Sequence, residues 1–238
     1  MTQSLEPALR QGLAGLALAL DDMQVGQLLN YLSLIDKWNK VYNLTAVRDP
    51  QEMLTHHLLD SLAVVNPVQA YLASAHRAAD APGERKSLRL LDVGSGAGLP
   101  GVVLAICCPA LEVHCVDTVG KKAAFIQQVA VSLGLPHLRA LHARVEKLRG
   151  SYDLVCSRAF ASLLDFTSWS EAVLAPQGAW MAMKGKHPAQ ELAALPPQFE
   201  VFHVEQLAVP GLDAERCLVW LRPGLGGAPA SLGGGLLQ

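Results

Sequence analysis

The stretch Leu88-Arg89-Leu90-Leu91-Asp92-Val93-Gly94-Ser95-Gly96-Ala97-Gly98 decides the fold of this 238-residue chain. Its apolar first half has the length of a buried strand, and its glycines allow a tight turn directly afterwards. The sequence from residue 100 to 108 suits a helix. A strand, a glycine-rich turn and a helix in this order are typical of nucleotide sites in doubly wound sheets. We therefore expect a ligand at the carboxyl end of this strand.

Strand and helix patterns alternate after this turn, which predicts an α/β fold with a mostly parallel sheet and helices on both faces. A loop containing Pro210-Gly211 separates the last two predicted strands, so we expect them to pair antiparallel. The further strands are predicted over residues 112–117, 138–141, 152–157, 179–184, 199–206 and 217–222, and the helices over 100–108, 121–133, 163–174 and 190–195.

The chain divides into four regions by composition. Residues 1–72 form an N-terminal helical extension, 73–87 a small and polar linker, 88–222 the α/β domain, and 223–238 a Gly-rich disordered tail. The apolar run 12–20 imitates a targeting signal, but leucines at spacings of three and four favour an amphipathic helix. Because no apolar run approaches the ~20 residues of a membrane span, we expect a cytoplasmic protein.

Charge and cysteine content narrow the function classes. Only 17% of residues are charged and the formal net charge is −2, so any nucleic acid must be held by a local basic patch. The five cysteines have no metal-ligand spacing, which predicts buried free thiols and no metal site.

Two nucleoside ligands compete for the glycine turn. Dinucleotide enzymes use G-x-G-x-x-G, but Leu99 stands at the third glycine position, and the turn reads G-x-G-x-G. That pattern favours S-adenosylmethionine. Asp117, at the end of the next strand, is placed to accept hydrogen bonds from ribose hydroxyls with either ligand. Glu146 could meet an adenine edge or belong to a solvated helix turn.

If the ligand is S-adenosylmethionine, the residues after the fourth strand indicate which type of atom receives the methyl group. They lack the Asn/Asp-Pro-Pro motif of enzymes that act on exocyclic amines, and Cys156 lies inside an apolar run, which favours a structural thiol over a nucleophile. Guanine N7 already has an in-plane lone pair and needs mainly alignment. Basic residues at the ligand-bearing sheet edge, Arg158 and Lys184 with Lys186, and Arg48, His56 and His57 of the N-terminal helices, could hold phosphates.

The chain resembles the bacterial 16S rRNA guanine-N7 methyltransferase family (RsmG/GidB). The likeness extends over about residues 30–222 and rests on six blocks: residues 37–45, 57–61, 92–101, Asp117 with Lys121-Lys122, residues 157–161, and Lys184-Gly185. It implies a Rossmann-like class I S-adenosylmethionine-dependent methyltransferase that modifies N7 of a specific guanine in 16S rRNA.

The resemblance also implies residue roles. By this likeness, His57 and Lys184 would lie near the RNA or the target base. From their place at the ligand-bearing sheet edge we also expect Arg158 and Lys184 to serve catalysis, whereas Lys186 could contact RNA or be an ordinary surface charge. The S-adenosylmethionine pocket would be lined by Gly94, Gly96, Leu99, Asp117, Val145, Glu146 and Arg158. The partner would be 16S rRNA or the small ribosomal subunit, and the protein a monomer. His56 stands where the family often has Arg, which puts one phosphate contact in doubt, and Thr118 replaces the usual Ser.

Two other functions stay open from sequence alone. An NAD-dependent oxidoreductase would use a similar sheet, although Leu99 and the lack of an evident hydride-transfer constellation argue against it. A noncatalytic RNA-binding protein for ribosome assembly would not need the intact glycine turn with Asp117.

Overall fold

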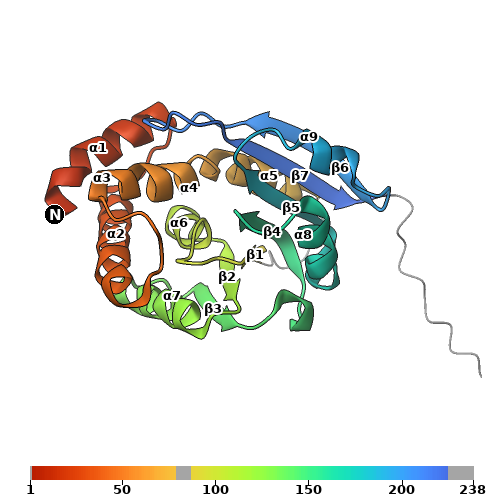
Figure 1. Ribbon diagram of the computed structural model, residues 1–238, viewed down its shortest axis with the longest axis horizontal. Helices are drawn as coiled ribbons and strands as arrows, with labels where there is room; N and C mark the ends of the chain where they lie inside the picture. Colours follow the sequence, from red (N-terminus) through yellow and green to blue (C-terminus); the bar gives the residue numbers. More distant parts are fainter. Residues whose placement is uncertain (1, 79–86, 225–238) are drawn as a thin grey trace, which may run out of the picture.

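The computed structural model describes residues 2–78 and 87–224, which contain one seven-stranded sheet (Figure 1). The strand order is β3-β2-β1-β4-β5-β7-β6. Strands β1 to β5 run parallel to one another, and β7 lies antiparallel between β5 and β6. The mostly parallel α/β sheet and its antiparallel end are therefore confirmed. The strands are β1 (Arg89–Val93), β2 (Glu112–Asp117), β3 (Leu138–His142), β4 (Tyr152–Arg158), β5 (Leu174–Lys184), β6 (Phe199–Gln206) and β7 (Cys217–Pro223).

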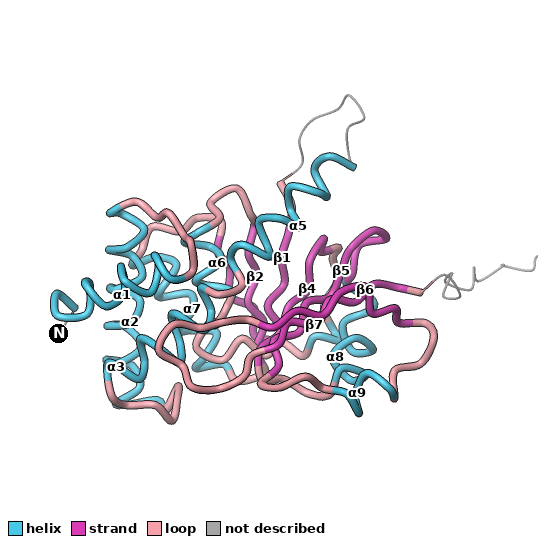
Figure 2. Tube along the Cα trace, turned by 90° about the horizontal axis from the view of Figure 1, so that it is seen from above, coloured by secondary structure: helices cyan, strands magenta, loops and turns pink. Residues whose placement is uncertain are grey.

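Helices cover both faces of the sheet (Figure 2). Alternate strand residues face opposite cores, so Leu90 joins the N-terminal helices and α6 while Leu91 joins the core beneath α8. The helices of the sheet domain are α6 (Gly101–Cys107), α7 (Gly120–Ser132), α8 (Leu163–Ser170) and α9 (Ala189–Ala193), with short 3₁₀ turns η2 (Val145–Lys147) and η3 (Glu171–Val173).

The N-terminal segment is helical, as its leucine spacing predicts. It contains α1 (Thr2–Gly15), α2 (Asp22–Tyr42), α3 (Pro50–Met53), the π-helix η1 (Leu54–Leu59), α4 (Asp60–Leu62) and α5 (Val65–Ala78). Asp21 caps α2 by accepting from the amide of Gln24, whose side chain accepts from the Asp21 amide in return. Helix α2 packs against α6 and α7, so this segment shares one hydrophobic core with the sheet.

Two predicted boundaries between regions of the chain were wrong. Helix α5 continues to Ala78, so residues 73–78 of the predicted linker are helical, because small residues there do not break the helix before Pro82-Gly83. Pro223 ends β7 and the Gly224 amide donates to Gln198 O, so neither residue belongs to the predicted disordered tail. The remaining linker residues 79–86 and tail residues 225–238 lie outside the described residues.

Strand β5 also begins earlier than expected. The sequence predicted a helix that ends at residue 174 and a strand that begins at residue 179, and residues 175–178 between them contain Pro176 and Gly178. In the structure a register shift between β4 and β5 accommodates them, and Leu174 pairs with Tyr152. A bulge of this kind tolerates Pro and Gly inside a strand.

The fold leaves an open edge for a ligand where the strand order reverses between β1 and β4. The turn after β1 lies at this edge, and helix α2 supports it from behind: the buried Tyr31 hydroxyl donates to Ala97 O over 2.7 Å. Within the described residues, none of the helices combines the length and apolar character needed to cross a bilayer.

Replacing Tyr31 by Phe should lower the free energy of unfolding by about 1–2 kcal/mol, because the Ala97 carbonyl then stays buried without this donor. Chemical denaturation of the two proteins measures the difference. A stability equal to that of the unmodified chain would show that the hydrogen bond does not support the turn.

Candidate functional site

Two cavities meet at Gly94, on the carboxyl edge of the sheet. The first, which we call the helix-roofed cavity, has a volume of about 410 Å³ and includes residues of the N-terminal segment. The second, the aromatic cavity, has a volume of about 430 Å³ and includes Phe160 and Trp169. Gly94 lines both cavities, so a ligand that passes over the glycine turn can occupy both.

The glycine turn has a backbone that side chains disfavour. Gly94, Gly96 and Gly98 have φ values of 66°, 60° and 92°. A Cβ at Gly94 would overlap the Phe160 ring, whereas a Cβ at Gly96 would meet no atom closer than 4.0 Å and would project into open space. The turn is therefore a bare backbone cradle, as a closely approaching ligand requires. Gly94, Gly96 and Leu99 all line the helix-roofed cavity, in agreement with their predicted position.

Asp117 lies at the end of β2 in the wall of the aromatic cavity. Its Oδ2 accepts from the Gly96 amide over 3.0 Å and its Oδ1 from the Val119 amide over 2.8 Å. Lys122 Nζ is 3.7 Å from Oδ2. A carboxylate has about four acceptor positions, so each oxygen can still accept from a ribose hydroxyl. Asp117 therefore holds the glycine turn and faces the ligand space at once.

The rest of the aromatic cavity is lined by residues that follow β3 and β4. Val145 and Glu146, from the 3₁₀ turn after β3, belong to its lining. Phe160 and Trp169 belong to it too, with ring centroids 5.8 Å apart in an edge-to-face arrangement. The roles of these two rings were missed, because Trp169 lies in a helix after β4 and its sequence context does not relate it to Val145.

The helix-roofed cavity is covered by a continuous helical stretch, Pro50–Leu62, whose middle is the π-helix. π-helical turns are rare and frequently mark functional sites. The Asp60 amide, which in a regular α-helix would donate to His56 O, donates to Thr55 O and His57 O instead. The His56 carbonyl accepts from Arg158 Nη1 over 2.9 Å.

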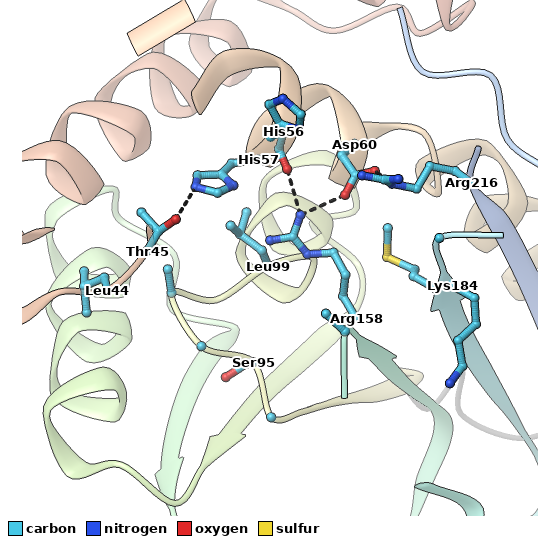
Figure 3. Close-up of a pocket in the computed structure, with 16 residues that line it drawn as sticks. Leu44, Thr45, His56, His57, Asp60, Ser95, Leu99, Arg158, Lys184 and Arg216 are labelled. Carbon is cyan, nitrogen blue, oxygen red and sulfur yellow. Dashed lines mark hydrogen bonds and ion pairs between the residues drawn. The ribbon is translucent and has the colours of Figure 1, made fainter. Parts of the chain in front are cut away.

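His57 lines this cavity but is almost fully buried. Its Nε2 lies 2.8 Å from the Thr45 hydroxyl, and its buried Nδ1 has no hydrogen-bond partner (Figure 3). Burial and the neighbouring Arg158 guanidinium lower the pKa of His57 to about 4. The ring is therefore neutral at physiological pH, and it brings no charge to a phosphate.

Arg158 extends from the end of β4 to the helical roof, where it meets Asp60 (Figure 3). Arg158 Nη1 is 2.8 Å from Asp60 Oδ2, and Arg216 Nε is 2.6 Å from Asp60 Oδ1. All three residues line the helix-roofed cavity. Sequence analysis anticipated Arg158 here but gave no role to Asp60 or Arg216, since these two residues lie 156 positions apart.

The two lysines after β5 have different surroundings. Lys184 lines the helix-roofed cavity, but its ammonium contacts Ala161 O and both Glu191 oxygens and points away from His57 and Asp60 in Figure 3. Lys186 is exposed and lies outside both cavity linings. The structure thus brings Lys184, but not Lys186, to the cavity.

The cysteines are buried free thiols, as predicted. Cys156 is fully buried in β4, and burial raises the pKa of its thiol. A thiolate nucleophile for pyrimidine carbon is therefore not favoured here.

Residues 24–219 match the family described as rRNA small subunit methyltransferase G (GidB). The chain belongs to this family. It is 64% identical over 220 residues to the ribosomal RNA small subunit methyltransferase G of Paracidovorax citrulli strain AAC00-1, an alignment that covers 92% of this chain and 90% of the relative. It is 65% identical over 217 residues to the protein of the same name from Polaromonas sp. strain JS666, with 91% and 93% covered.

Membership in the methyltransferase G family confirms the resemblance that the sequence motifs indicate, and it argues against the oxidoreductase and noncatalytic alternatives.

Among solved structures, the chain is similar to a SAM-dependent methyltransferase from Aquifex aeolicus, with 16% identity, a TM-score of 0.48, and 73% of this chain and 98% of that chain covered.

The depressed pKa of His57 gives a test of its environment. Folding lowers this pKa from about 6.5, so the stability that depends on neutral His57 is present above pH 6.5 and is lost as the pH falls towards 4. Relative to a His57→Gln variant, the unmodified protein should lose about 2 kcal/mol of unfolding free energy between pH 7.5 and pH 5. Denaturant titrations at the two pH values measure this, and a difference that stays constant with pH would contradict it.

Proposed function

We propose that this methyltransferase transfers the methyl group of S-adenosylmethionine to N7 of a guanine in 16S rRNA of the small ribosomal subunit. One observation carries the proposal: a nucleoside-sized aromatic cavity opens, over a side-chain-free turn at Gly94, into a second cavity that has arginines but no free carboxylate. The family membership of the chain supports the reaction class.

The residues of the aromatic cavity suit the adenosine portion of the donor. Asp117 accepts from the ribose hydroxyls, and the space lined by Val145, Phe160 and Trp169 receives the planar base. Gly94 and Gly96 then let the remainder of the molecule pass close to the backbone. When bound, S-adenosylmethionine supplies an electrophilic methyl group on a sulfonium.

The helix-roofed cavity suits a nucleophile that needs no deprotonation. Asp60 is the only carboxylate among the described residues that line it, and both of its oxygens bind arginines. His57 is neutral, but its Nε2 is held by Thr45. The carboxylate of Asp60 and Nε2 of His57 are therefore already engaged, which suits guanine N7, a nucleophile that needs no deprotonation, better than an amine that must lose a proton. The residues align the two reactants and exclude water.

The roles of the remaining basic residues follow from their places. Arg158 contacts the donor in the helix-roofed cavity, and His57 lies beside the target base in the same cavity. Lys184 also lines this cavity, but its ammonium is paired with Glu191, so its part is to hold the cavity wall next to the RNA. Lys186 lies beyond the cavity and contacts a more distant part of the RNA backbone.

We further propose that the protein works as a monomer in the cytoplasm, without a metal.

Methyl transfer to isolated 30S subunits tests this function. Purified protein, S-adenosylmethionine with a tritiated methyl group and unmethylated subunits should give labelled 16S rRNA, in which nuclease digestion and mass spectrometry detect 7-methylguanosine. Naked 16S rRNA in a parallel reaction shows whether the assembled subunit is required. Label in another nucleoside, or none in either substrate, would refute the proposal.

Asp117→Ala should weaken binding of S-adenosylhomocysteine by at least about tenfold, because it removes the ribose acceptor and releases the Gly96 amide. Isothermal titration calorimetry measures the affinity. Asp36→Asn, which removes an exposed ion pair with Lys40, is the control and should leave it unchanged. An unaltered affinity in Asp117→Ala would remove this residue from the site.

A further inference from the structure

Asp60 is a buried carboxylate that joins three distant parts of the chain. It is only 3% exposed, and it follows the π-helix in the N-terminal segment. One oxygen binds Arg158 at the end of β4, and the other binds Arg216, just before β7. A buried carboxylate is stable only when it is paired. The ionised form of Asp60 therefore depends on the two arginines, and the positions of the two guanidinium groups depend on Asp60.

The helical stretch Pro50–Leu62, which we call the roof helix, binds Arg158 at two points. Nη1 of Arg158 donates to Asp60 Oδ2 and to His56 O, both from the same helical turn. The second bond depends on the π-helix, since the Asp60 amide does not donate to His56 O as it would in a regular α-helix. Both bonds use one nitrogen, whereas a guanidinium has five N–H donors on three nitrogens. The remaining donors leave room for a second, planar acceptor.

The charges at this wall leave an excess of one positive charge. Arg158 and Arg216 share the single carboxylate of Asp60, and Lys184 is paired with Glu191. Arg158 shares its cavity with Gly96 and Leu99, next to the Gly94 junction. A donor whose adenosine occupies the aromatic cavity has its methionine portion on this side of Gly94. Its carboxylate is the anion that matches a guanidinium fork.

We propose that Asp60 is a positioning residue, which holds the Arg158 guanidinium in place for the carboxylate of the donor's methionine portion. This inference rests on the proposed use of S-adenosylmethionine. It gives the N-terminal segment a part in cofactor recognition: the roof helix sets the direction of an arginine that belongs to the sheet domain. Without the Asp60 charge, Arg158 loses its anchor and faces Arg216 without the carboxylate between them.

Two ligands separate this role from a structural one. S-adenosylhomocysteine contains the methionine-derived carboxylate, and 5′-methylthioadenosine lacks it while keeping the nucleoside. Calorimetry should show that Asp60→Asn weakens binding of S-adenosylhomocysteine by at least about tenfold, as expected for a lost charge-assisted contact, and changes that of 5′-methylthioadenosine by less than about twofold. Equal weakening of both ligands, or of neither, would overturn the proposal.

A double-mutant cycle tests whether Asp60 acts through Arg158. Arg158→Gln alone should reduce the preference for S-adenosylhomocysteine at least as far as Asp60→Asn does, and the double variant should lose no more than Arg158→Gln. Additive losses would mean that Asp60 acts by another route. Glu200→Gln, which breaks an arginine–carboxylate pair on β6 and β7, is the matched control and should keep the full preference.

Folding and function are checked separately. Thermal unfolding of each variant is recorded first, and if Asp60→Asn does not fold, Asp60→Glu keeps the charge but displaces both oxygens. The same selective loss is then expected, and an unselective or absent loss counts against the proposal. If the unmodified protein binds neither ligand, the proposed function fails. If the unmodified protein shows the preference and the Asp60 variants keep it, this inference alone fails.

Discussion

Hydrogen bonds between the glycine turn and the end of β2 determine where the two cavities meet. The amides of Gly94 and Ser95 donate to Val116 O, and the Gly96 amide donates to the Asp117 carboxylate. These bonds require positive φ angles that glycine adopts without strain. The Phe160 ring fills the space where a Gly94 side chain would lie. The turn is thus fixed by β2 on one side and by the segment after β4 on the other, and Gly94 within it lines both cavities.

The N-terminal segment contributes to the site as a wall. Tyr31 on α2 holds Ala97 of the turn from behind, and the roof helix supplies His56 O and Asp60 to Arg158. The same segment shares its hydrophobic core with one face of the sheet. These contacts join the N-terminal helices both to Arg158 and to the glycine turn. A substitution in the helices can therefore affect the site although no residue of the turn is changed. The segment therefore forms part of the catalytic domain in physical terms.

Sequence reasoning located the parts of the site that local patterns encode. The strand before Gly94, the turn itself and Asp117 follow from strand length, glycine spacing and parallel topology, which place the carboxyl ends of neighbouring strands at one edge. The Asp60 pairs were not predictable in this way, because they join residues 98 and 156 positions apart, and neither the π-helix nor an ion pair has a periodic signature. The sequence placed the positive charge of Lys184 at the ligand-bearing sheet edge, but only the structure shows that Glu191 pairs with it.

Arg158, Arg216 and Lys184 are paired with carboxylates, and this pairing suits the proposed reaction better than a patch of unpaired basic residues would. Methylation at N7 leaves a positive charge on the guanine ring, and unpaired cations close to it would oppose that product. In the helix-roofed cavity, Lys184 is neutralised by Glu191, the two arginines share Asp60, and His57 is kept neutral by burial. The remaining positive charge is small and is held at the wall by Asp60. A chain with a net charge of −2 can in this way hold an anionic donor group beside a base that becomes cationic.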